Sequence, residues 1–485
     1  MTEAAVAVLP RSIADDTAFI GHPRGLGWLS ASEFWERFSY YGMQTLLVLY
    51  LTHYLLLPGN IEQVWGFEAF RHFLGHVYGA TSQMALASNT AQLYAALVYV
   101  TPLAGGFLAD RLIGRTTTVT LGAITMVIGT FLLALNSTFL IALALLLFGV
   151  GCFKANIASQ VGALYRIDDP RRADGFQIYF MGIQLAVIIS PFICSTLGER
   201  VDWHLGFVAA GVGMVFGLAI YLAGRRHYPP EPLRRKGDRV ERPPLTNRDW
   251  RAVILLVALL PVLALSIIGN QQIFDAYLIW GEKAFIKPTI HLIYPGWHAA
   301  GLYWGHLSFV MPIGYLVSLD AFVSAVTMVG VIAFWRWYGK RWKEPDEITK
   351  IVIGVFISAL GPLVLAGCAA VAKSTGHPVP LYWALGFHIL NDIGFANVLP
   401  VGLALYSRAA PKGLGGIMIA VYYVHLFIGN LLTGYLGGLL GTMSDATFWL
   451  MHVVLMAISA VILLVVRFAF AHVVAPTIAD AAATA

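Results

Sequence analysis

Charge is scarce in this sequence. Only 12% of its 485 residues are Asp, Glu, Lys or Arg, whereas 58% are hydrophobic. A soluble globular chain carries roughly a quarter charged residues, so the composition excludes that class. Stretches such as 120–135 and 453–466 contain no charged residue and, with their flanks, are long enough to cross a bilayer as helices. The sequence therefore predicts an all-α protein with many membrane spans.

Other features are missing as well. The three cysteines (Cys152, Cys194 and Cys368) all lie in apolar runs, so we expect no disulfide framework. The absence of a Gly-rich P-loop argues against an ATP-driven pump. Residues 1–20 lack the basic region of a secretory signal. No group of His, Cys and acids has metal-ligand spacing along the chain, so we expect neither a metal nor a cofactor.

The apolar stretches form twelve spans. They lie near residues 28–57, 79–108, 115–136, 138–164, 174–197, 203–223, 250–281, 308–337, 349–372, 381–407, 413–440 and 446–471. A proline-rich, basic linker separates six spans from six, an arrangement typical of transporters built from two membrane halves. The predicted regions are a tail at 1–27, a bundle at 28–223, the linker at 224–249, a bundle at 250–471 and a tail at 472–485. The stretch 58–77 is either a short interfacial helix or an ordered surface loop.

The distribution of basic residues predicts the orientation. With both termini in the cytoplasm, about 24 of the 31 Lys and Arg lie inside and about 5 outside, which follows the positive-inside rule. The basic linker obeys this rule, although it could also bind anionic lipids. We expect a multi-pass protein of the bacterial inner membrane that acts as a monomer.

The first span carries three charged side chains. Its sequence reads Glu33-Phe-Trp-Glu36-Arg37-Phe-Ser-Tyr40-Tyr41-Gly-Met-Gln44. Helical periodicity places positions 33, 36/37, 40/41 and 44 on one face. Charged groups in a membrane span are costly and normally face a cavity or one another. A structural ion pair needs only two such groups, so the third favours a functional site.

This run resembles the signature of the proton-coupled oligopeptide transporter family, within the major facilitator superfamily. The stretch 106–115 is similar to the superfamily's loop between the second and third helices, where Asp110, Arg111 and Arg115 would lock one cytoplasmic arrangement. The stretch 149–156, with Lys154, is similar to the family's Gly-x-Gly-x-x-Lys segment. Residues 180–184 and 400–403 are weaker matches.

The resemblance implies a major facilitator fold and a symporter that imports di- and tripeptides with protons by alternating access. It implies that Glu33, Glu36 and Arg37 couple protons and that Lys154 binds the peptide carboxylate. A lysine that only snorkels to the interface is the alternative. The other residues expected at the substrate site are Tyr40, Tyr41, Gln44, Tyr94, Gln184, Asn270, Asp392 and Tyr422. Protons, small peptides and membrane lipids are the expected partners, and nucleic acid is not.

The second half departs from the family pattern. Gln44 and Asn270 stand where peptide carriers have an arginine and an acid, so we predict a periplasmic gate held by neutral hydrogen bonds. Phe395 replaces the glutamate that receives the peptide amino group. Asp320 is an additional acid, and we predict that it takes part in proton coupling; Asp392 is a further candidate.

Three more ionisable groups fall within spans. Asp275 lies toward the predicted periplasmic end of the seventh span. His388 and His425 could shuttle protons, although a hydrogen-bonded core histidine is the commoner case.

Two alternatives to peptide transport remain open. A transporter of nitrate or another small anion would use Lys154 as its counter-charge, and the loss of the amino-group acid favours it. A sensor or scaffold on the same fold would tolerate neutral residues at Glu33 and Glu36, which this chain does not have.

Overall fold

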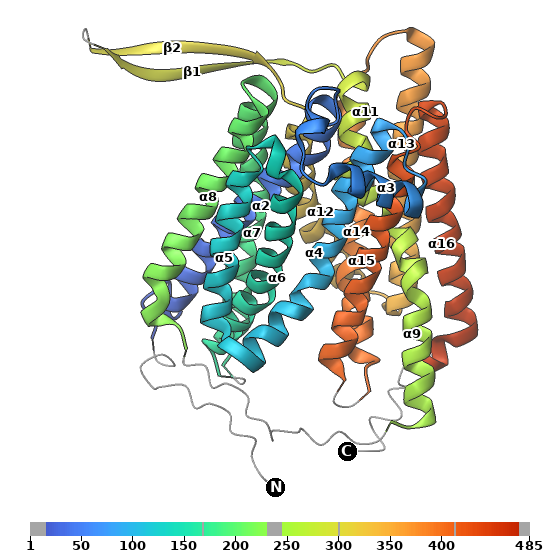
Figure 1. The fold of residues 1–485 in the computed structure, drawn as a ribbon. Helices are drawn as coiled ribbons and strands as arrows, with labels where there is room; N and C mark the ends of the chain where they lie inside the picture. Colours follow the sequence, from blue (N-terminus) through green and yellow to red (C-terminus); the bar gives the residue numbers. More distant parts are fainter. Residues whose placement is uncertain (1–15, 167–168, 230–244, 299–300, 412–413, 475–485) are drawn as a thin grey trace.

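Twelve long helices form the body of the protein in the computed structural model, which describes residues 16–166, 169–229, 245–298, 301–411 and 414–474 (Figure 1). The first six are α2 (Arg24–Tyr50), α4 (Gln83–Leu108), α5 (Arg115–Leu132), α6 (Phe139–Ala163), α7 (Arg171–Arg200) and α8 (Trp203–Gly224). The second six are α9 (Asn247–Ser266), α12 (Tyr315–Gly339), α13 (Glu347–Thr375), α14 (Tyr382–Arg408), α15 (Gly415–Gly437) and α16 (Asp445–Val474). The described chain begins and ends at the same end of this bundle (Figure 1).

Eleven of these helices are long and apolar enough to cross a membrane. The twelfth, α2, has 27 residues and differs by carrying Glu33, Glu36 and Arg37. The predicted all-α membrane fold is therefore confirmed, with eleven apolar spans among the described residues, and α2 as a twelfth span stays a prediction.

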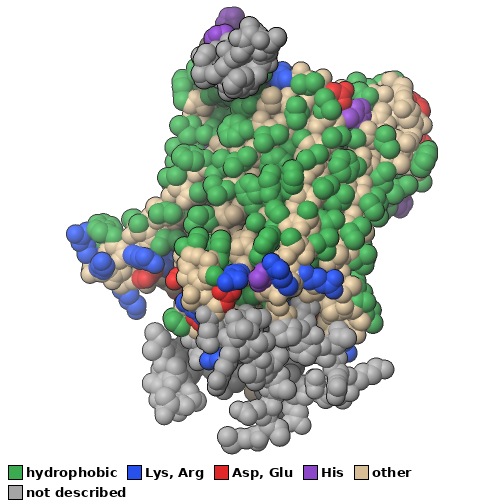
Figure 2. Space-filling view, turned by 90° about the vertical axis from the view of Figure 1, so that its left-hand side faces the viewer, with side chains coloured by type: hydrophobic (Ala, Val, Ile, Leu, Met, Phe, Trp, Pro, Cys, Tyr) green, Lys and Arg blue, Asp and Glu red, His purple; other side chains and the backbone are tan. Residues whose placement is uncertain are grey.

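The surface has the pattern of a protein embedded in lipid. Figure 2 shows a broad belt of hydrophobic side chains, with Lys and Arg gathered below it, near the end where the described chain begins and ends. Large apolar side chains are exposed within the belt helices, among them Phe107 at 62%, Met181 at 59% and Val329 at 68%. A soluble monomer rarely exposes so much contiguous apolar surface.

The seventh span is broken, so the prediction of one continuous span over 250–281 is wrong. After α9 the chain forms α10 (Ile268–Gln271), a 3-10 turn η6 (Gln272–Phe274) and α11 (Ala276–Ala284). Asp275 leaves the helical region with φ −142° and ψ −119°. The side-chain oxygen of Gln272 accepts from the backbone N–H of Ala276 at 3.2 Å. This bond satisfies an N–H that the break would otherwise leave free.

A β-hairpin follows α11, where the sequence predicted a loop and the start of the eighth span. Strands β1 (Thr289–His298) and β2 (Gly301–Val310) pair antiparallel from Thr289↔Val310 to His298↔Gly301. The hairpin projects sideways from the bundle, at the end opposite the described chain ends (Figure 1). Its strands are rich in β-branched and aromatic residues, which explains why this apolar stretch does not extend α12.

The stretch 58–77 contains a short helix, which decides between the two alternatives left open by the sequence. After a 3-10 turn η2 (Ile61–Gln63), α3 (Phe67–Tyr78) packs through its buried Phe67 and Leu74. Two further 3-10 turns, η4 (Asn136–Thr138) and η5 (Arg225–His227), follow α5 and α8.

The first six helices meet the second six along two pairs of helices. Helix α4 packs against α15, and α7 packs against α12. Residues 230–244 of the predicted linker lie outside the described residues, and the division into two bundles stays a prediction.

Candidate functional site

An ion cluster lies inside α2. The guanidinium of Arg37 donates to both carboxylate oxygens of Glu36, with Nη2 at 2.6 Å from Oε1, and lies 3.2 Å from Glu33 Oε1. These residues are 2%, 0% and 1% exposed, respectively. Two carboxylates and one guanidinium leave one formal negative charge in a buried place. Such a charge is costly unless a proton or another cation joins the cluster.

Aromatic side chains extend the α2 face. Arg37 lies over the Tyr40 ring at 5.0 Å, and Tyr40 packs edge-on against Tyr41 at 5.0 Å. The Tyr41 ring lies 6.1 Å from Phe274 of η6, so this face reaches the second half of the protein.

Two predicted polar residues near this face have buried atoms with open hydrogen-bonding capacity. Tyr94 Oη on α4 and Gln44 Oε1 on α2 have no hydrogen-bond partner among the described residues. Buried polar atoms are nearly always satisfied, so water or a ligand is the expected partner.

Lys154 is positioned on α6 by close helix packing. A Cβ on Gly105 of α4 would lie 2.0 Å from the carbonyl oxygen of Gly151, so glycine at this position lets α4 approach α6. The Lys154 ammonium then lies 5.1 Å from the centre of the Tyr99 ring. It interacts electrostatically with Arg37 and both α2 glutamates, but forms no ion pair within the described part of the chain. Its charge is therefore available to an anionic ligand.

A second polar cluster joins α11, α12 and α14. His388 Nδ1 lies 2.9 Å from Asp320 Oδ1, and its Nε2 lies 3.0 Å from the Tyr277 hydroxyl. Asp392 lies one turn from His388 and accepts from Asn391 Nδ2 at 3.3 Å. Asp320 retains 15% side-chain exposure, whereas His388 is fully buried.

The expectation that no group of His and acids has metal-ligand spacing is wrong. Asp320, His388 and Asp392 each offer a ligand atom, and these atoms lie within 4.8 Å of one another. Sequence reasoning named both acids but did not join them to His388. The signal was the four-residue interval between His388 and Asp392, which places both on one face of a helix.

The two halves meet through contacts that the sequence did not predict. Ser88 of α4 is hydrogen-bonded to Asp275, and its Oγ lies 2.9 Å from the carbonyl oxygen of Gly434 on α15. The carboxylate of Glu199, at the end of α7, accepts from the backbone N–H groups of Ile313 at 2.7 Å and Gly314 at 2.9 Å. A carboxylate at the start of α12 is favourable because the free N–H groups and the helix dipole attract it.

The predicted gate residues do not pair with each other. Gln44 and the half-buried Asn270 share no hydrogen bond among the described residues. A different polar contact lies at this end, where His53 Nε2 is 2.8 Å from Glu282 Oε2.

At the opposite end, the predicted gate loop is partly paired. Arg115 Nη2 lies 3.3 Å from Asp110 Oδ1, and Arg111 is exposed. Asp110 and Arg111 lie in a π-helical turn η3 (Ala109–Ile113) that continues α4.

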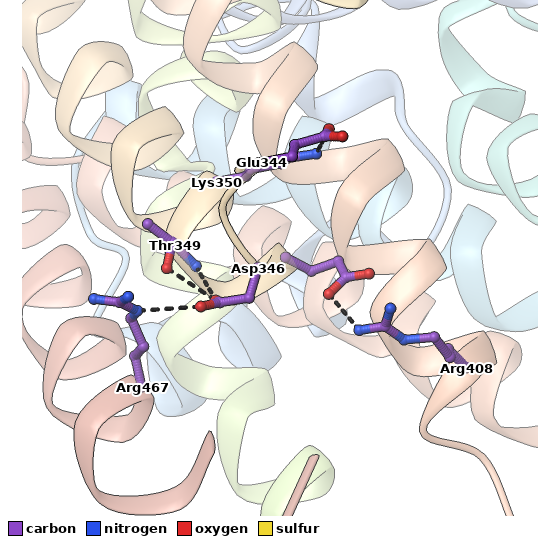
Figure 3. A network of polar contacts seen from close by, with 7 residues as sticks. Glu344, Asp346, Thr349, Lys350, Arg408 and Arg467 are labelled. Atoms are coloured by element: carbon purple, nitrogen blue, oxygen red, sulfur yellow. Dashed lines mark hydrogen bonds and ion pairs between the residues drawn. The ribbon is translucent and has the colours of Figure 1, made fainter. Parts of the chain in front are cut away.

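A corresponding network in the second half was missed. Asp346 caps α13 by accepting from Thr349 N at 2.8 Å, and its other oxygen lies 3.3 Å from Arg467 Nε of α16 (Figure 3). The neighbouring pairs are Glu347 with Arg408 and Glu344 with Lys350. An aspartate just before the apolar run that starts at residue 348 was the available signal.

The remaining predicted site residues have different surroundings. Gln184 is half-buried on α7. Tyr422 is fully buried on α15, and its hydroxyl donates to the carbonyl oxygen of Leu399 at 2.9 Å. This bond connects α15 to α14, so the Tyr422 hydroxyl stabilises the packing of two helices in the second half.

Comparisons with known proteins agree over most of the chain. The family model described as "POT family" matches residues 116–241. A di-/tripeptide transporter of Lactococcus lactis subsp. lactis is 28% identical over 93% of this chain and 96% of its own length. The peptide transporter YePEPT of Yersinia enterocolitica is 27% identical over 87% of this chain and 88% of its own length.

Solved structures share the fold. A crystal structure of a POT peptide transporter in complex with alafosfalin has a TM-score of 0.76 and 23% identity, with 94% of this chain and 96% of that chain covered. A POT family transporter in complex with 5-aminolevulinic acid has a TM-score of 0.71 at 23% identity, with 94% and 98% covered. The family model, the curated relatives and the solved structures agree with the α2 signature and the Lys154 segment, and the chain is similar to the POT family over most of its length.

Proposed function

We propose that this protein is a symporter that imports di- and tripeptides together with protons by alternating access. The observation that carries the proposal is the buried cluster of Glu33, Glu36 and Arg37, with the unpaired cation of Lys154 nearby. Relatives whose names state di-/tripeptide transport, over nearly the full chain, support peptides as the cargo. They do not favour the alternative of nitrate or another small anion.

In this proposal the peptide carboxylate binds Lys154, whose charge no carboxylate of the described residues occupies. A proton that joins Glu33 or Glu36 weakens the hold of that carboxylate on Arg37. The cluster then has no net charge, which lowers the cost of moving α2 against its neighbours. Asp320, with its exposed edge, is the group through which the second half exchanges protons with the cavity.

The driving force is sufficient without ATP. A membrane potential of about 100 mV contributes ~2.3 kcal/mol per proton, and one pH unit contributes about 1.4 kcal/mol. Together they sustain an accumulation of several hundred-fold. The same proposal places the protein in the inner membrane as a monomer with both termini in the cytoplasm, next to the basic end of the surface in Figure 2.

Uptake of labelled di-alanine into proteoliposomes tests the proposal. We expect accumulation above equilibrium only when an inward proton gradient is imposed, and its collapse when a protonophore is added. Accumulation of nitrate but not di-alanine would contradict the assignment of cargo. Di-alanine uptake that never exceeds equilibrium would contradict the coupling.

A further inference from the structure

Asp275 is a buried acid placed where the two halves touch. It lies at the break between η6 and α11 and is 0% exposed. Ser88 reaches it from α4, in the first half. A Cβ on Gly437 of α15 would lie 2.3 Å from both Asp275 Oδ2 and Ser88 Oγ. The three helices therefore close directly around this carboxyl group.

The surroundings of Asp275 are neutral. Its hydrogen bond is with the Ser88 hydroxyl, and the other polar group that acts on it is the backbone N–H of Ala276, which donates to Gln272. Its Oδ1 has no hydrogen-bond partner, and no Lys, Arg or His of the described residues pairs with it. The residues next to Asp275 in η6 contact two titratable side chains of packed helices, Tyr41 against Phe274 and His452 against Gln272. An ionised carboxylate in such a place would be an uncompensated buried charge.

The hydrogen bonds of Ser88 favour a protonated Asp275. Ser88 Oγ lies at hydrogen-bond distance from two acceptors, Asp275 Oδ2 and the carbonyl oxygen of Gly434. A serine hydroxyl has one proton to donate, and a carbonyl oxygen has none. Both bonds are satisfied when Ser88 donates to Gly434 and a protonated Asp275 donates to Ser88. An ionised Asp275 would have to compete with Gly434 for the same proton.

We infer that protonated Asp275 latches the contact between α4 and α15, and that loss of this proton opens that end of the bundle. This inference rests on the proposed proton-coupled function. In that cycle Asp275 takes up a proton while its end of the bundle is open, and the contact closes around the neutral acid. Release of the proton toward the other side leaves a buried charge, and this charge drives the contact apart for the next cycle.

The opening of the contact between α4 and α15 can be measured without a transport assay. Gln83 and Thr442 are exposed, one at the start of α4 and the other beyond the end of α15. Spin labels on Gln83→Cys and Thr442→Cys report the separation of these helices, and the three native cysteines are buried. In the wild-type background we expect the short distance at low pH and a growing population of longer distances as pH rises. A distance distribution that does not change with pH would overturn the latch.

Two variants give opposite results if Asp275 is the latch. Asp275→Asn keeps the shape, stays neutral and can donate to Ser88, so the short distance should persist at every pH. Ser88→Ala removes the acceptor, so longer distances should appear at lower pH than in wild type. Ser88→Ala also keeps the test decisive if Asp275→Asn does not fold. Asp445→Asn is the matched control, because Asp445 lies outside the contact and, within the described part of the chain, its carboxylate accepts from Trp280 Nε1 alone.

A transport assay then shows whether the latch fails by itself or together with the proposed function. Because Asp275→Asn keeps the contact between α4 and α15 closed at every pH, the variant cannot complete the transport cycle. Its proton-driven uptake of di-alanine should fall close to that of liposomes without the protein. If wild-type uptake is proton-driven and Asp275→Asn takes up as much di-alanine as wild type, the latch is overturned and the proposed function stands. Wild-type uptake that is not proton-driven overturns the proposed function and the latch with it.

Discussion

Glu36 is the acid most tightly bound to Arg37, which makes it the first residue to test for proton coupling. Glu36→Gln removes a proton-binding group while it keeps the side-chain shape. With one pH unit imposed, we expect accumulation of di-alanine to fall about tenfold for the lost proton. Counterflow exchange should persist because it requires no net proton movement.

Glu68→Gln on the exposed face of α3 is the control for this experiment, since Glu68 is exposed and pairs with His72 on its own helix. Full gradient-driven accumulation in Glu36→Gln would remove the α2 cluster from the coupling machinery.

Lys154 provides the positive charge expected to bind the peptide carboxylate. Hydrogen bonds to charged groups contribute about 1.5–3 kcal/mol, so Lys154→Ala should weaken di-alanine binding by about ten- to hundredfold. Calorimetric titration measures this directly. A di-alanine amide, which lacks the carboxylate, should bind both proteins equally, and the exposed Lys373→Ala should change nothing. Equal affinity of wild type and Lys154→Ala for free di-alanine would place the carboxylate site elsewhere.

In the structure Asp320 lies next to His388, so the proposed role of Asp320 in proton coupling can be tested at both residues. Because His388 bridges Asp320 and Tyr277, Asp320→Asn and His388→Gln should have the same effect: proton-driven accumulation falls, and peptide binding changes less. The measurement is uptake in liposomes across a range of pH together with binding affinity. His425→Gln is the matched control, because the His425 ring bonds only to a carbonyl of its own helix. Wild-type accumulation and pH profile in both variants would make the cluster purely structural.

At the scale of helices and turns, the cap of α13 connects the cytoplasmic ends of α13 and α16 in the proposed orientation. Burial alone would raise the pKa of Asp346, but hydrogen bonds from Thr349 and Arg467 outweigh it and lower the pKa below 3.8. A lowered pKa in the folded state means that the ionised form stabilises the fold. This contribution is present above the unfolded pKa and is lost as pH falls through the folded pKa.

Asp346→Ala should therefore lower the stability at neutral pH by about 0.5–2 kcal/mol, the usual worth of a helix cap. Thermal unfolding in detergent at pH 7 measures this loss. The difference between wild type and variant should shrink as the pH falls below the folded pKa of Asp346. An equal melting temperature at pH 7 would mean that Thr349 and Arg467 do not depend on this carboxylate.

The helices could be predicted from the sequence because every helix that crosses a bilayer needs a long, mostly apolar run of residues. Charge-free stretches located the spans, and the spacing of Glu33, Glu36 and Arg37 placed them on one face. The break at Asp275 could not be predicted, because it depends on the side chain of Gln272 as a local acceptor. The hairpin was missed since its apolar residues resemble the start of another span.

For the whole molecule, the sequence located charges but not their partners. Asp320, His388 and Asp392 come from two helices whose relative rotation no local pattern encodes. The same holds for Ser88 and Asp275, which are 187 positions apart. The expected gate pair, Gln44 and Asn270, was inferred from family positions, whereas the contacts between the halves formed where glycines allow close approach.

The hairpin has a practical consequence for imaging. A detergent micelle around this 52.8 kDa chain would cover most of its mass, which leaves little for particle alignment in electron cryomicroscopy. Strands β1 and β2 project clear of the helices, while their base is fixed by the bond from Met311 N to the Pro288 carbonyl at 2.9 Å and by Ile290 packed on the core. A nanobody raised against this arm, or a small domain fused into it, would form a fiducial mark beside the bundle, at the end opposite the described chain ends.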